Sequence, residues 1–539
     1  MRKAHHLRRR SEVQAGVVSI GRRKDVNHNQ WGEADMKFLL INPPIGVFYE
    51  AVVPPIGLAY LAAALRQAGH QAEILDINLW RWPPDEVRRR LAASDADAFG
   101  ITGLISQYTY NKWLADTIKE EYPDRPVIQG GMMVSAMPKI MLEESPSTDF
   151  VVVGEGEQTL VELADALEGH RPLQSVKGLW YHDPAQPGKL IVTGHRPDMP
   201  DVDPLPYPAW DLVDIPAYWQ SRARAREMHL IYKNKRFIPL LATRGCPYRC
   251  NYCHRFADDR LRQRSTESVL AEIDHWRAIY DIEYVDFQDE LWGLSKQRAK
   301  EFCQALKATG WNITWGCSIR LNVIDEEMIR MMVESGCVFV SFGVESGSEE
   351  ILINMNRRMK REVIVRGWNI VKKYKLTHLP SFMIGYIGET PETIRETVDL
   401  VCQMDVGSFA GWFRYVTPLP GTQLYEYAKV KGLIQDEKAY IEEAGKTFAG
   451  LTTFDKLLVN LTEMSDEELR DWREWGRREI LRHHLRRHPL RYPLQLAHDG
   501  VNYLRRHGVR QTWRHIPEII RQHLPEASPY HLPVGAAHD

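Results

Sequence analysis

Residues 240–255 read LLATRGCPYRCNYCHR and hold three of the chain's seven cysteines. Three residues separate Cys246 from Cys250, two residues separate Cys250 from Cys253, and a short apolar run comes just before them. A structural zinc site normally closes with four ligands, and iron–sulfur electron carriers use four cysteines per cluster. Three thiolates at this spacing therefore predict a metal centre with one position left open.

Other potential ligands do not complete the triplet. His254 directly follows Cys253, and two adjacent residues rarely reach one tetrahedral centre together. A closed zinc site or a purely structural triplet is the alternative. The remaining cysteines stand singly in segments that we expect to be helices or strands, where a small buried hydrophobe is the ordinary role: Cys303, Cys317, Cys337 and Cys402.

The composition places the chain among ordinary globular proteins. Of its 539 residues, 44% are hydrophobic and 26% are charged, and the formal charge of -2 gives no general attraction to nucleic acid or anionic lipid. Clustered cysteines without a secretion signal indicate metal in a reducing compartment, so we expect a cytoplasmic protein. No run approaches the roughly 18 apolar residues of a membrane span.

The first residues differ from the rest of the chain. The opening MRKAHHLRRR is basic, but no apolar region follows it, so it does not have the pattern of a signal peptide. Residues 1–35 are predicted to form a disordered basic tail. The sequence MKFLLINPP begins abruptly at Met36, which is therefore an alternative translation start.

Residues 36–170 alternate apolar strand-like runs with helix-compatible segments. Five such units in series predict an α/β fold with a doubly wound parallel sheet. Such a sheet binds its ligand at the carboxyl ends of its strands, which here are rich in glycine and proline. The runs are KFLLINPP (37–44), QAEILDI (71–77), DAFGITG (97–103), PVIQGG (126–131) and DFVVVGEGE (149–157).

A second alternation follows a break in the pattern. Residues 171–236 contain GLWY and LIVTG, a predicted hairpin, and then the proline-rich DVDPLPYPAWDL, which favours an extended linker. Residues 237–432 hold six further strand–helix units, which predict a partial (βα)6 barrel of the triosephosphate isomerase type with its chemistry where the strands end. Residues 433–539 are predicted to form a helical, Arg-rich segment. The barrel runs are FIPLLATRGC, EYVDFQDE, ITWGCSIR, CVFVSFGVESGS, LPSFMIGYIGET and GWFRYVTPLPGT.

The cysteine spacing and its surroundings resemble the signature of the radical S-adenosylmethionine (SAM) enzymes. Tyr252 stands just before the last cysteine, and a strand-like run just before the first. The resemblance implies that Cys246, Cys250 and Cys253 hold three irons of a four-iron four-sulfur (4Fe-4S) cluster, while SAM chelates the fourth iron. It also implies that the reduced cluster cleaves SAM to a 5'-deoxyadenosyl radical, which abstracts a hydrogen atom from the substrate.

The same resemblance assigns SAM contacts along the barrel. Asp289 and Glu290 match an acidic position that accepts a charge-assisted hydrogen bond from the ammonium group of SAM. Arg320 matches a cationic position near its carboxylate. The remaining implied contacts are Ser341 and Glu345 near the carboxylate and ribose, Ile387 in GYIGET (385–390) beside the adenine, and Tyr252. The alternative is that Asp289, Arg320 and Glu345 are ordinary strand-end charges.

The N-terminal domain narrows the resemblance. A five-unit parallel sheet ahead of a radical barrel, with PPIGLAYLAAALRQAGH, QGGMMVSAMP, VVVGEGEQTL and TPLPGTQLY, resembles the cobalamin-binding subfamily, which includes methyltransferases and anaerobic porphyrin-ester cyclases. It covers about residues 36–430 and makes residues 36–170 a cobalamin-binding-like domain. A nicotinamide or flavin is the alternative ligand, although no G-x-G-x-x-G follows the first strand. The implied cobalamin contacts are Pro43, Gly103, Leu104, Ser106, Gly130, Gly131, Gly154 and Glu155.

The sequence differs from many cobalamin carriers in the axial ligand of cobalt. Those carriers supply a histidine after the first strand, in a D-x-H-x-x-G motif. Here that loop is NPPIGVFYEAVVPPIG and contains no histidine. His70 follows the first predicted helix, at the opposite pole of the sheet, so we expect it to be a surface histidine. Cobalamin is therefore expected to bind without a protein histidine on cobalt, with the loop at residues 104–106 or water at its lower face.

The resemblance implies a cobalamin-dependent radical enzyme, with methyl transfer to an unactivated carbon as the leading reaction. The substrate radical would take the methyl group from methylcobalamin, which a second SAM would regenerate. A radical cyclisation, rearrangement or oxidation is the alternative within the same fold. The expected partners are a small-molecule substrate and an electron donor such as a flavodoxin or ferredoxin.

A protein of another class, an iron–sulfur nucleic-acid-binding module, is the second alternative. It would need a basic or aromatic binding face, which the neutral barrel does not display, so no nucleic acid is expected as a partner. The sequence assigns no catalytic acid or base.

The Arg-rich stretch DWREWGRREILRHHLRRHPLRYPL (471–494) carries the least functional information. Bunched arginines on a helix usually form a solvated face. A lid over the barrel mouth, or a patch that contacts an acidic or membrane-associated substrate, are the alternatives. Pro489 and Pro493 interrupt any long amphipathic helix in this stretch.

Overall fold

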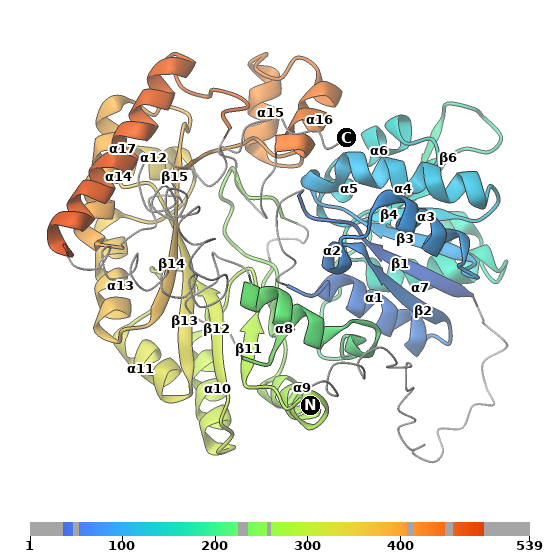
Figure 1. The fold of residues 1–539 in the computed structure, drawn as a ribbon, viewed down its shortest axis with the longest axis horizontal. Coiled ribbons are helices and arrows are strands. Elements are labelled where there is room, and N and C mark those ends of the chain that lie inside the picture. The colour runs from blue at the N-terminus through green and yellow to red at the C-terminus, as the bar shows by residue number, and fades with distance from the viewer. Residues whose placement is uncertain are drawn as a thin grey trace, which may run out of the picture.

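The computed structural model describes residues 36–46, 53–224, 235–255, 260–406, 413–447 and 456–489. The predicted basic tail at 1–35 and the C-terminal residues 490–539 lie outside these ranges. Both predicted α/β units are present, the first coloured blue to cyan in Figure 1 and the second green through yellow to orange.

The first domain is built on a sheet with the strand order β2-β1-β3-β4-β5-β6-β7. Its first five strands are parallel, as predicted: β1 (Lys37–Asn42), β2 (Gln71–Asp76), β3 (Ala98–Thr102), β4 (Val127–Gly130) and β5 (Phe150–Val152). The helices that follow these strands are α1 (Ile56–Gln67), α2 (Ile77–Trp80), α3 (Pro84–Ala92), α4 (Tyr108–Glu121), α5 (Met132–Ala136), α6 (Pro138–Glu144) and α7 (Gly156–Leu167), with a 3-10 turn η1 (Ile105–Gln107).

Two apolar layers cover the two faces of this sheet. Phe38 and Leu40 of β1 pack with α1 and α7, whereas Leu39 and Ile41 pack with α3 and α4. Successive side chains of a strand point to opposite faces, so the continuous apolar run KFLLIN supplies both layers. This packing leaves the carboxyl ends of the strands as the edge available to a ligand.

The predicted hairpin forms, but it belongs to the sheet and not to a linker. Strands β6 (Leu179–His182) and β7 (Leu190–Val192) pair antiparallel, and β6 also pairs antiparallel with β5. The sheet is therefore mixed and continues past residue 170. Two predictions are corrected here: the sheet is not parallel throughout, and the hairpin is part of it and not of a linker that begins at residue 171. Leu179 and Tyr181 of the hairpin are buried in the core of the first domain.

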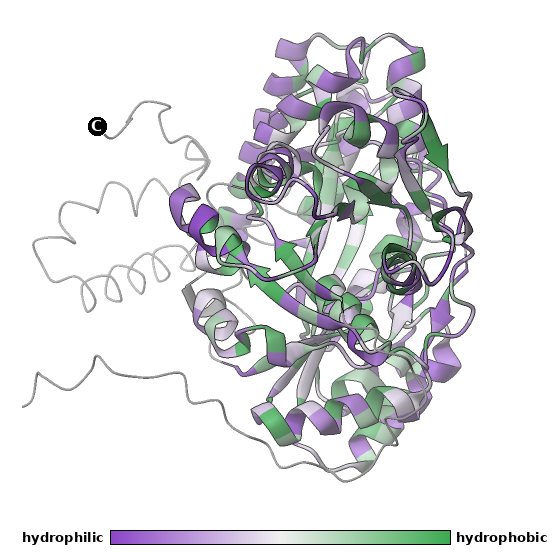
Figure 2. Ribbon diagram, turned by 90° about the vertical axis from the view of Figure 1, so that its right-hand side faces the viewer, coloured by the Kyte–Doolittle hydropathy of each residue, from purple (hydrophilic) through white to green (hydrophobic). Residues whose placement is uncertain are grey.

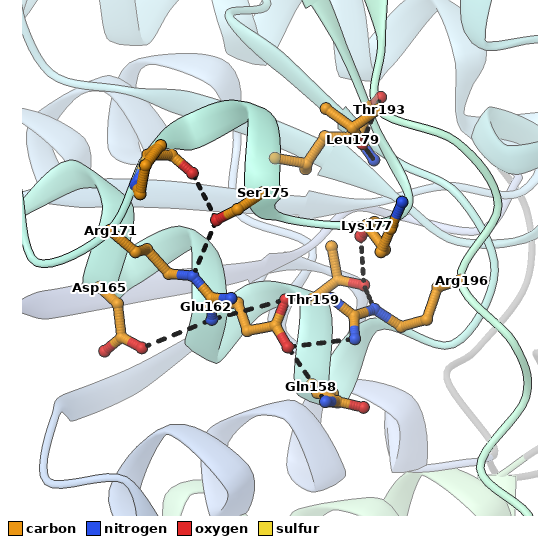
Figure 3. A network of polar contacts seen from close by, with 11 residues as sticks. Gln158, Thr159, Glu162, Asp165, Arg171, Ser175, Lys177, Leu179, Thr193 and Arg196 are labelled. Carbon is orange, nitrogen blue, oxygen red and sulfur yellow. Dashed lines mark hydrogen bonds and ion pairs between the residues drawn. The ribbon is translucent and has the colours of Figure 1, made fainter.

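Polar contacts hold the hairpin on α7 (Figure 3). The guanidinium of Arg196 donates to the Thr159 hydroxyl at 2.7 Å and pairs with Glu162, and the Thr159 hydroxyl donates to the Lys177 carbonyl at 3.2 Å. Arg171, just after the predicted domain end, also pairs with Glu162 at 3.6 Å. These contacts tie residues 171–196 to the first domain.

The segment between the domains contains a helix that the proline-rich sequence did not predict. After two 3-10 turns, η2 (Leu173–Ser175) and η3 (Trp210–Leu212), the chain forms α8 (Ile215–Arg224). The Tyr218 hydroxyl donates to Asp76 at the end of β2 at 2.6 Å, and the Trp219 indole donates to the Phe237 carbonyl at 2.7 Å. The helix α8 therefore bridges the first sheet and the start of the second.

The second domain is a six-stranded parallel sheet in the order β15-β14-β13-β12-β11-β8. All six predicted strands are present: β8 (Phe237–Leu240), β11 (Tyr284–Phe287), β12 (Thr314–Ile319), β13 (Cys337–Glu345), β14 (Thr377–Ile384) and β15 (Phe413–Tyr415). The helices are α9 (Thr266–Tyr280), α10 (Lys296–Ala308), α11 (Glu326–Glu334), α12 (Glu349–Asn354), α13 (Arg361–Lys373), α14 (Pro391–Met404) and α15 (Gln423–Val430). A small ribbon pairs β9 (Thr243–Arg244) with β10 (Arg262–Gln263).

The two C-terminal helices cover different parts of the molecule. α16 (Glu437–Thr447) packs on η1 and α4 of the first domain, and α17 (Asp466–Arg487) packs along α14 (Figure 1). The buried Arg473 donates to the Phe413 carbonyl of the edge strand β15 at 2.9 Å. α17 thus lies on the barrel wall at its edge strand, and five of its arginines form a solvated face: Arg470, Arg478, Arg482, Arg486 and Arg487.

The hydropathy of the chain follows this architecture. Figure 2 shows hydrophobic strands inside and hydrophilic helix faces outside. His70 lies after α1 as predicted, but the prediction that it is exposed is wrong: its side chain is buried against Phe38, with ring centroids 6.2 Å apart. Among the described helices, none is both long and apolar enough to span a membrane.

Candidate active site

The cysteine triplet lies in the loop after β8, at the end of the barrel where its parallel strands finish. The segment after α12 holds this loop from outside: Asn251 N donates to the Met355 carbonyl at 3.1 Å, and the Asn356 amide donates to the Arg249 carbonyl at 2.6 Å. Within the loop, Cys253 N donates to the Cys250 carbonyl at 3.1 Å. A tight turn therefore presents the thiols at the strand ends.

Two buried arginines approach one thiol of the triplet. Arg320 at the end of β12 and Arg357 after α12 each place Nη1 3.7 Å from Cys250 Sγ. Arg320 also stacks on the Tyr248 ring at 3.7 Å, and Arg357 forms an ion pair with Glu345 at 3.6 Å. Guanidinium groups at this position stabilise negative charge on sulfur.

Sequence reasoning did not find Arg357. It identified Arg320 because that residue closes a predicted strand, but Arg357 comes twelve residues after the end of β13, beyond the short helix α12. The neighbouring Arg358 carries the same charge and is exposed. No signal in the sequence distinguishes the two, since only the tertiary fold brings one of them to Cys250.

The pKa values of the three thiols differ: burial raises the pKa of Cys246, whereas that of Cys250 is lowered. The hydrogen bond between the Cys253 and Cys250 thiols, together with the guanidinium of Arg357, lowers the pKa of Cys250, and the same hydrogen bond raises the pKa of Cys253. A thiolate is the form of cysteine that binds metal, so Cys250 is poised as a ligand.

The donor set fits a polynuclear cluster. A mononuclear ion needs its ligand atoms around one point, and within the described residues the three thiols do not all lie within 4.8 Å of one another. In an iron–sulfur cluster the cysteines bind different irons, so wider separation is expected. The cluster ligands Cys246, Cys250 and Cys253 remain a prediction that this geometry supports.

Asp289 is the clearest of the predicted SAM contacts. It follows β11, is 3% exposed, and its Oδ2 accepts from Ala242 N at 3.4 Å, while its Oδ1 has no hydrogen-bond partner among the described atoms. Burial raises the pKa of Asp289 to about 6. A buried acceptor without a donor is unfavourable, so a site that supplies an ammonium group would satisfy it.

Replacing Asp289 by asparagine should weaken SAM binding by about 1.5 to 3 kcal/mol, the usual range for a hydrogen bond to a charged group, and should leave the iron content unchanged. Because only the carboxylate attracts the ammonium group, the affinity of the parent enzyme should fall as pH drops through about 6. Isothermal titration calorimetry with SAM between pH 5 and 8 measures the affinity and its dependence on pH, and iron analysis measures the cluster content.

The asparagine variant should show no such dependence on pH. Glu290, the second predicted acid at this position, is exposed, so the control is Glu301→Gln, which changes an exposed acid on α10 and should bind SAM as the parent does. Loss of iron in the Asp289→Asn protein with unchanged SAM affinity would contradict the assignment.

The other predicted SAM contacts lie on neighbouring strands. Glu345 ends β13 with φ 72°, and the Ser381 hydroxyl of β14 donates to its carboxylate at 3.1 Å. Ser341 lies 2.7 Å from Ser318 between their hydroxyl oxygens. The buried Tyr252 hydroxyl has no partner among the described atoms, and Ile387 belongs to the same apolar cluster as Tyr252. Arg320 contacts Cys250 directly, Glu345 is joined to it through Arg357, and Ser341 lies on β13, four residues before Glu345.

The predicted cobalamin contacts come together at one edge of the first sheet. They follow the adjacent strands β1, β3, β4 and β5. At Gly131 the backbone has φ 96°, and a side chain there would meet Gly103 N at 2.9 Å, so both loops need glycine to lie this close. At Gly154, by contrast, nothing lies within 4 Å of the Cβ position, so the backbone there is open to a flat ligand.

The loop at residues 104–106 is only partly free. Ile105 is buried beneath α16, whose Gly445 lies against its carbonyl, and Gln107 joins the loop to Pro43 by donating to its carbonyl at 2.6 Å. The Ser106 hydroxyl is buried without a partner among the described atoms. An unsatisfied hydroxyl and an open glycine edge fit a polar, flat cofactor.

An ion-pair network joins this edge to the cluster loop. Arg244, two residues before Cys246, pairs with Glu155 at 3.3 Å and with Glu157 at 2.6 Å, and Arg262 pairs with Glu155 at 2.7 Å. The carboxylate of Glu155 therefore faces the barrel and holds the two domains together. Its predicted contact with cobalamin stays untested.

Comparisons with known families agree with both domains. Residues 44–164 match the B12 binding domain, and residues 240–401 match the radical SAM superfamily. The first match begins after β1 and takes in β2 to β5, and the second takes in the cysteine loop and β11 to β14.

Named relatives extend the similarity across both domains. An uncharacterized methyltransferase of Pyrococcus horikoshii is 32% identical over 405 residues, which are 74% of this chain and 84% of the relative. The anaerobic magnesium-protoporphyrin IX monomethyl ester cyclase of Rubrivivax gelatinosus is 28% identical over 395 residues, 72% of this chain and 68% of the relative.

A solved structure shares the fold. The radical SAM methyltransferase TsrM of Kitasatospora setae superimposes with a TM-score of 0.59 at 20% sequence identity, covering 74% of this chain and 77% of that one. With its B12-binding sheet, its radical SAM barrel and its similarity to the archaeal relative over both, the chain belongs to the cobalamin-dependent radical SAM enzymes, whose cofactors are a 4Fe-4S cluster, SAM and cobalamin.

Proposed function

We propose that this enzyme methylates an unactivated carbon of a small-molecule substrate. The network of Arg244 and Arg262 with Glu155 supports this, because it holds the edge of the first sheet against the cluster loop. A reaction that uses both cofactors on one substrate needs these two sites to face each other. The methyltransferase name of the P. horikoshii relative supports methyl as the group transferred.

The chain's own residues bind, orient and shield the reacting groups. When bound, the cluster and SAM supply a 5'-deoxyadenosyl radical, and cobalamin supplies the methyl group. Arg320 and Arg357 hold negative charge at Cys250, and Asp289 accepts from the ammonium group of SAM. Asp289, Arg320 and Glu345 are buried, and a site shielded from water protects a radical from side reactions.

The stoichiometry of SAM consumption tests the proposed reaction. Methylation should consume two SAM molecules per product, one ending as S-adenosylhomocysteine and one as 5'-deoxyadenosine with methionine. The two by-products should therefore appear in comparable amounts when the reduced, cobalamin-loaded enzyme turns over candidate substrates. With methyl-deuterated SAM, mass spectrometry should find the label in the product.

A cyclisation is the second candidate, and the similarity to the R. gelatinosus cyclase favours it over other non-methylating reactions. It predicts 5'-deoxyadenosine with product, S-adenosylhomocysteine at background and no deuterium in the product. That result would replace the methyltransferase proposal. Either reaction needs a one-electron reductant, for which we propose a flavodoxin or ferredoxin in the cytoplasm.

Cobalamin should bind the first domain without a protein histidine on cobalt. The loop after β1 carries no histidine in its sequence, and His70 is buried at the far pole of the sheet. Electron paramagnetic resonance of the bound cobalt(II) state should show no nitrogen superhyperfine splitting from a protein ligand. Enzyme with ¹⁵N-labelled histidine is the control, because a splitting that changes with this label would contradict the proposal.

A further inference from the structure

Three potential metal ligands meet on the outer wall of the barrel, away from the cysteine loop. Asp405 follows the last residue of α14 in a left-handed conformation, φ 54°. His484 lies in the last turn of α17, and His488 is the residue that caps it. Residues four apart lie on one face of a helix, so both imidazoles turn toward Asp405.

The three side chains form one compact group. Asp405 Oδ1 lies 3.4 Å from His484 Nδ1, and Asp405 Oδ2 lies 2.9 Å from His488 Nε2. One ligand atom from each residue lies within 4.8 Å of the other two, and within the described part of the chain this is the only such set of His, Cys, Asp and Glu. The imidazole rings are 4.6 Å apart between centroids.

We propose that Asp405, His484 and His488 bind a divalent transition-metal ion of the zinc class. Two imidazole nitrogens and one carboxylate oxygen are ligands that such ions prefer, and with bonds of about 2.0 to 2.2 Å the observed separations require only a small movement outward. A fourth position remains open to water. The set differs from the triplet of the cluster loop in both donor type and place.

The surroundings suit a bound cation. The side chains of His484 and Asp405 are 3% and 8% exposed, and that of His488 is 37% exposed, so an ion has an entry path from one side. Although burial opposes ionisation of Asp405, its hydrogen bonds to His488 and His484 lower its pKa, so it is a carboxylate at neutral pH. Arg487 lies 3.9 Å from Oδ2 but is more than half exposed.

The group lies away from the cluster loop and joins two helices. α14 begins after the carboxyl end of β14 and runs back along the barrel, so Asp405 at its far end lies at the opposite pole from Cys246. An ion there would link α17 to α14, the pair that covers the edge strand β15. Without an ion, the same groups still hydrogen-bond, and the bonds alone would then hold the helix.

Zinc titration of the cluster-loaded, full-length protein tests the proposal, because the loop cysteines are then occupied by iron. Under anaerobic conditions, chelator-treated protein should bind one more equivalent of Zn²⁺ than the His484→Ala/His488→Ala variant, by calorimetry and by elemental analysis after desalting. His275→Ala, an exposed histidine outside the set, should match the parent. Zinc should also raise the unfolding temperature of the parent and not of the double variant.

Two milder variants keep the test valid if the double variant folds poorly. His488→Ala leaves the buried pair of Asp405 and His484 intact, and Asp405→Asn keeps a hydrogen-bond acceptor but removes the negative ligand. Each should lose the extra zinc equivalent while retaining the 4Fe-4S cluster. Equal zinc uptake by the parent and these variants, or no uptake by any, overturns the proposal and leaves a hydrogen-bonded helix contact.

Discussion

Replacing Cys246, Cys250 and Cys253 together by alanine should abolish the 4Fe-4S cluster and, with it, all reductive cleavage of SAM. In the predicted site each thiolate would bind its own iron, and the other cysteines lie on α10, β12, β13 and α14 and not in this loop. After anaerobic reconstitution, iron and sulfide analysis should give values near zero, and the charge-transfer absorption of the cluster should be missing.

The matched control is Cys402→Ala, which removes a half-buried thiol on α14. It should reconstitute about as well as the parent. If the triple variant still bound about four irons and four sulfides, the ligands would have to be sought elsewhere, and the radical SAM site would not be this loop.

Replacing Arg357 by methionine should destabilise the barrel by about 3 to 5 kcal/mol, because removing one partner of a buried ion pair leaves an uncompensated charge. Arg357 and Glu345 are 6% and 7% exposed and lie 3.6 Å apart. Burial raises the pKa of Glu345, and the positive charge of Arg357 is the largest effect that lowers it. Urea unfolding of the cluster-free protein, followed by tryptophan fluorescence, measures the shift.

A double-mutant cycle separates this pair from general packing. Glu345→Gln with Arg357→Met should be clearly more stable than Arg357→Met alone, because the buried charge is then gone. The neighbouring Arg358→Met should change stability by about 0.5 kcal/mol or less, as is usual for an exposed side chain. If the single and double variants unfold alike, the pair is not coupled.

The strand pattern of both domains was readable from local sequence. Eleven runs were predicted as strands, and each forms one, because a strand buried on both faces needs a continuous apolar run bounded by turn residues. The hairpin was also predicted as a hairpin. Its place was not, since an alternating apolar pattern indicates a buried face but does not identify the partner strand.

The burial of His70 and the helix α8 were missed for related reasons. A single histidine between a helix and a strand is usually exposed, and only the packing of Phe38 from a neighbouring strand covers it. Tyr218 and Trp219 make α8 a bridge between two domains, so its stability comes from tertiary contacts and not from its proline-rich surroundings.

What the sequence by itself determined is local: the cysteine spacing that one turn can present, the strands, and the strand-end positions of Asp289, Arg320 and the glycine edge. What only the tertiary structure decided is long-range. Arg357 reaches Cys250 across 107 residues, and Arg244 reaches Glu155 across 89. The physical reason is that the sequence around a charged residue does not identify the residue with which it will pair. Packing of the strands and helices brings the two together, and burial then makes the pairing matter.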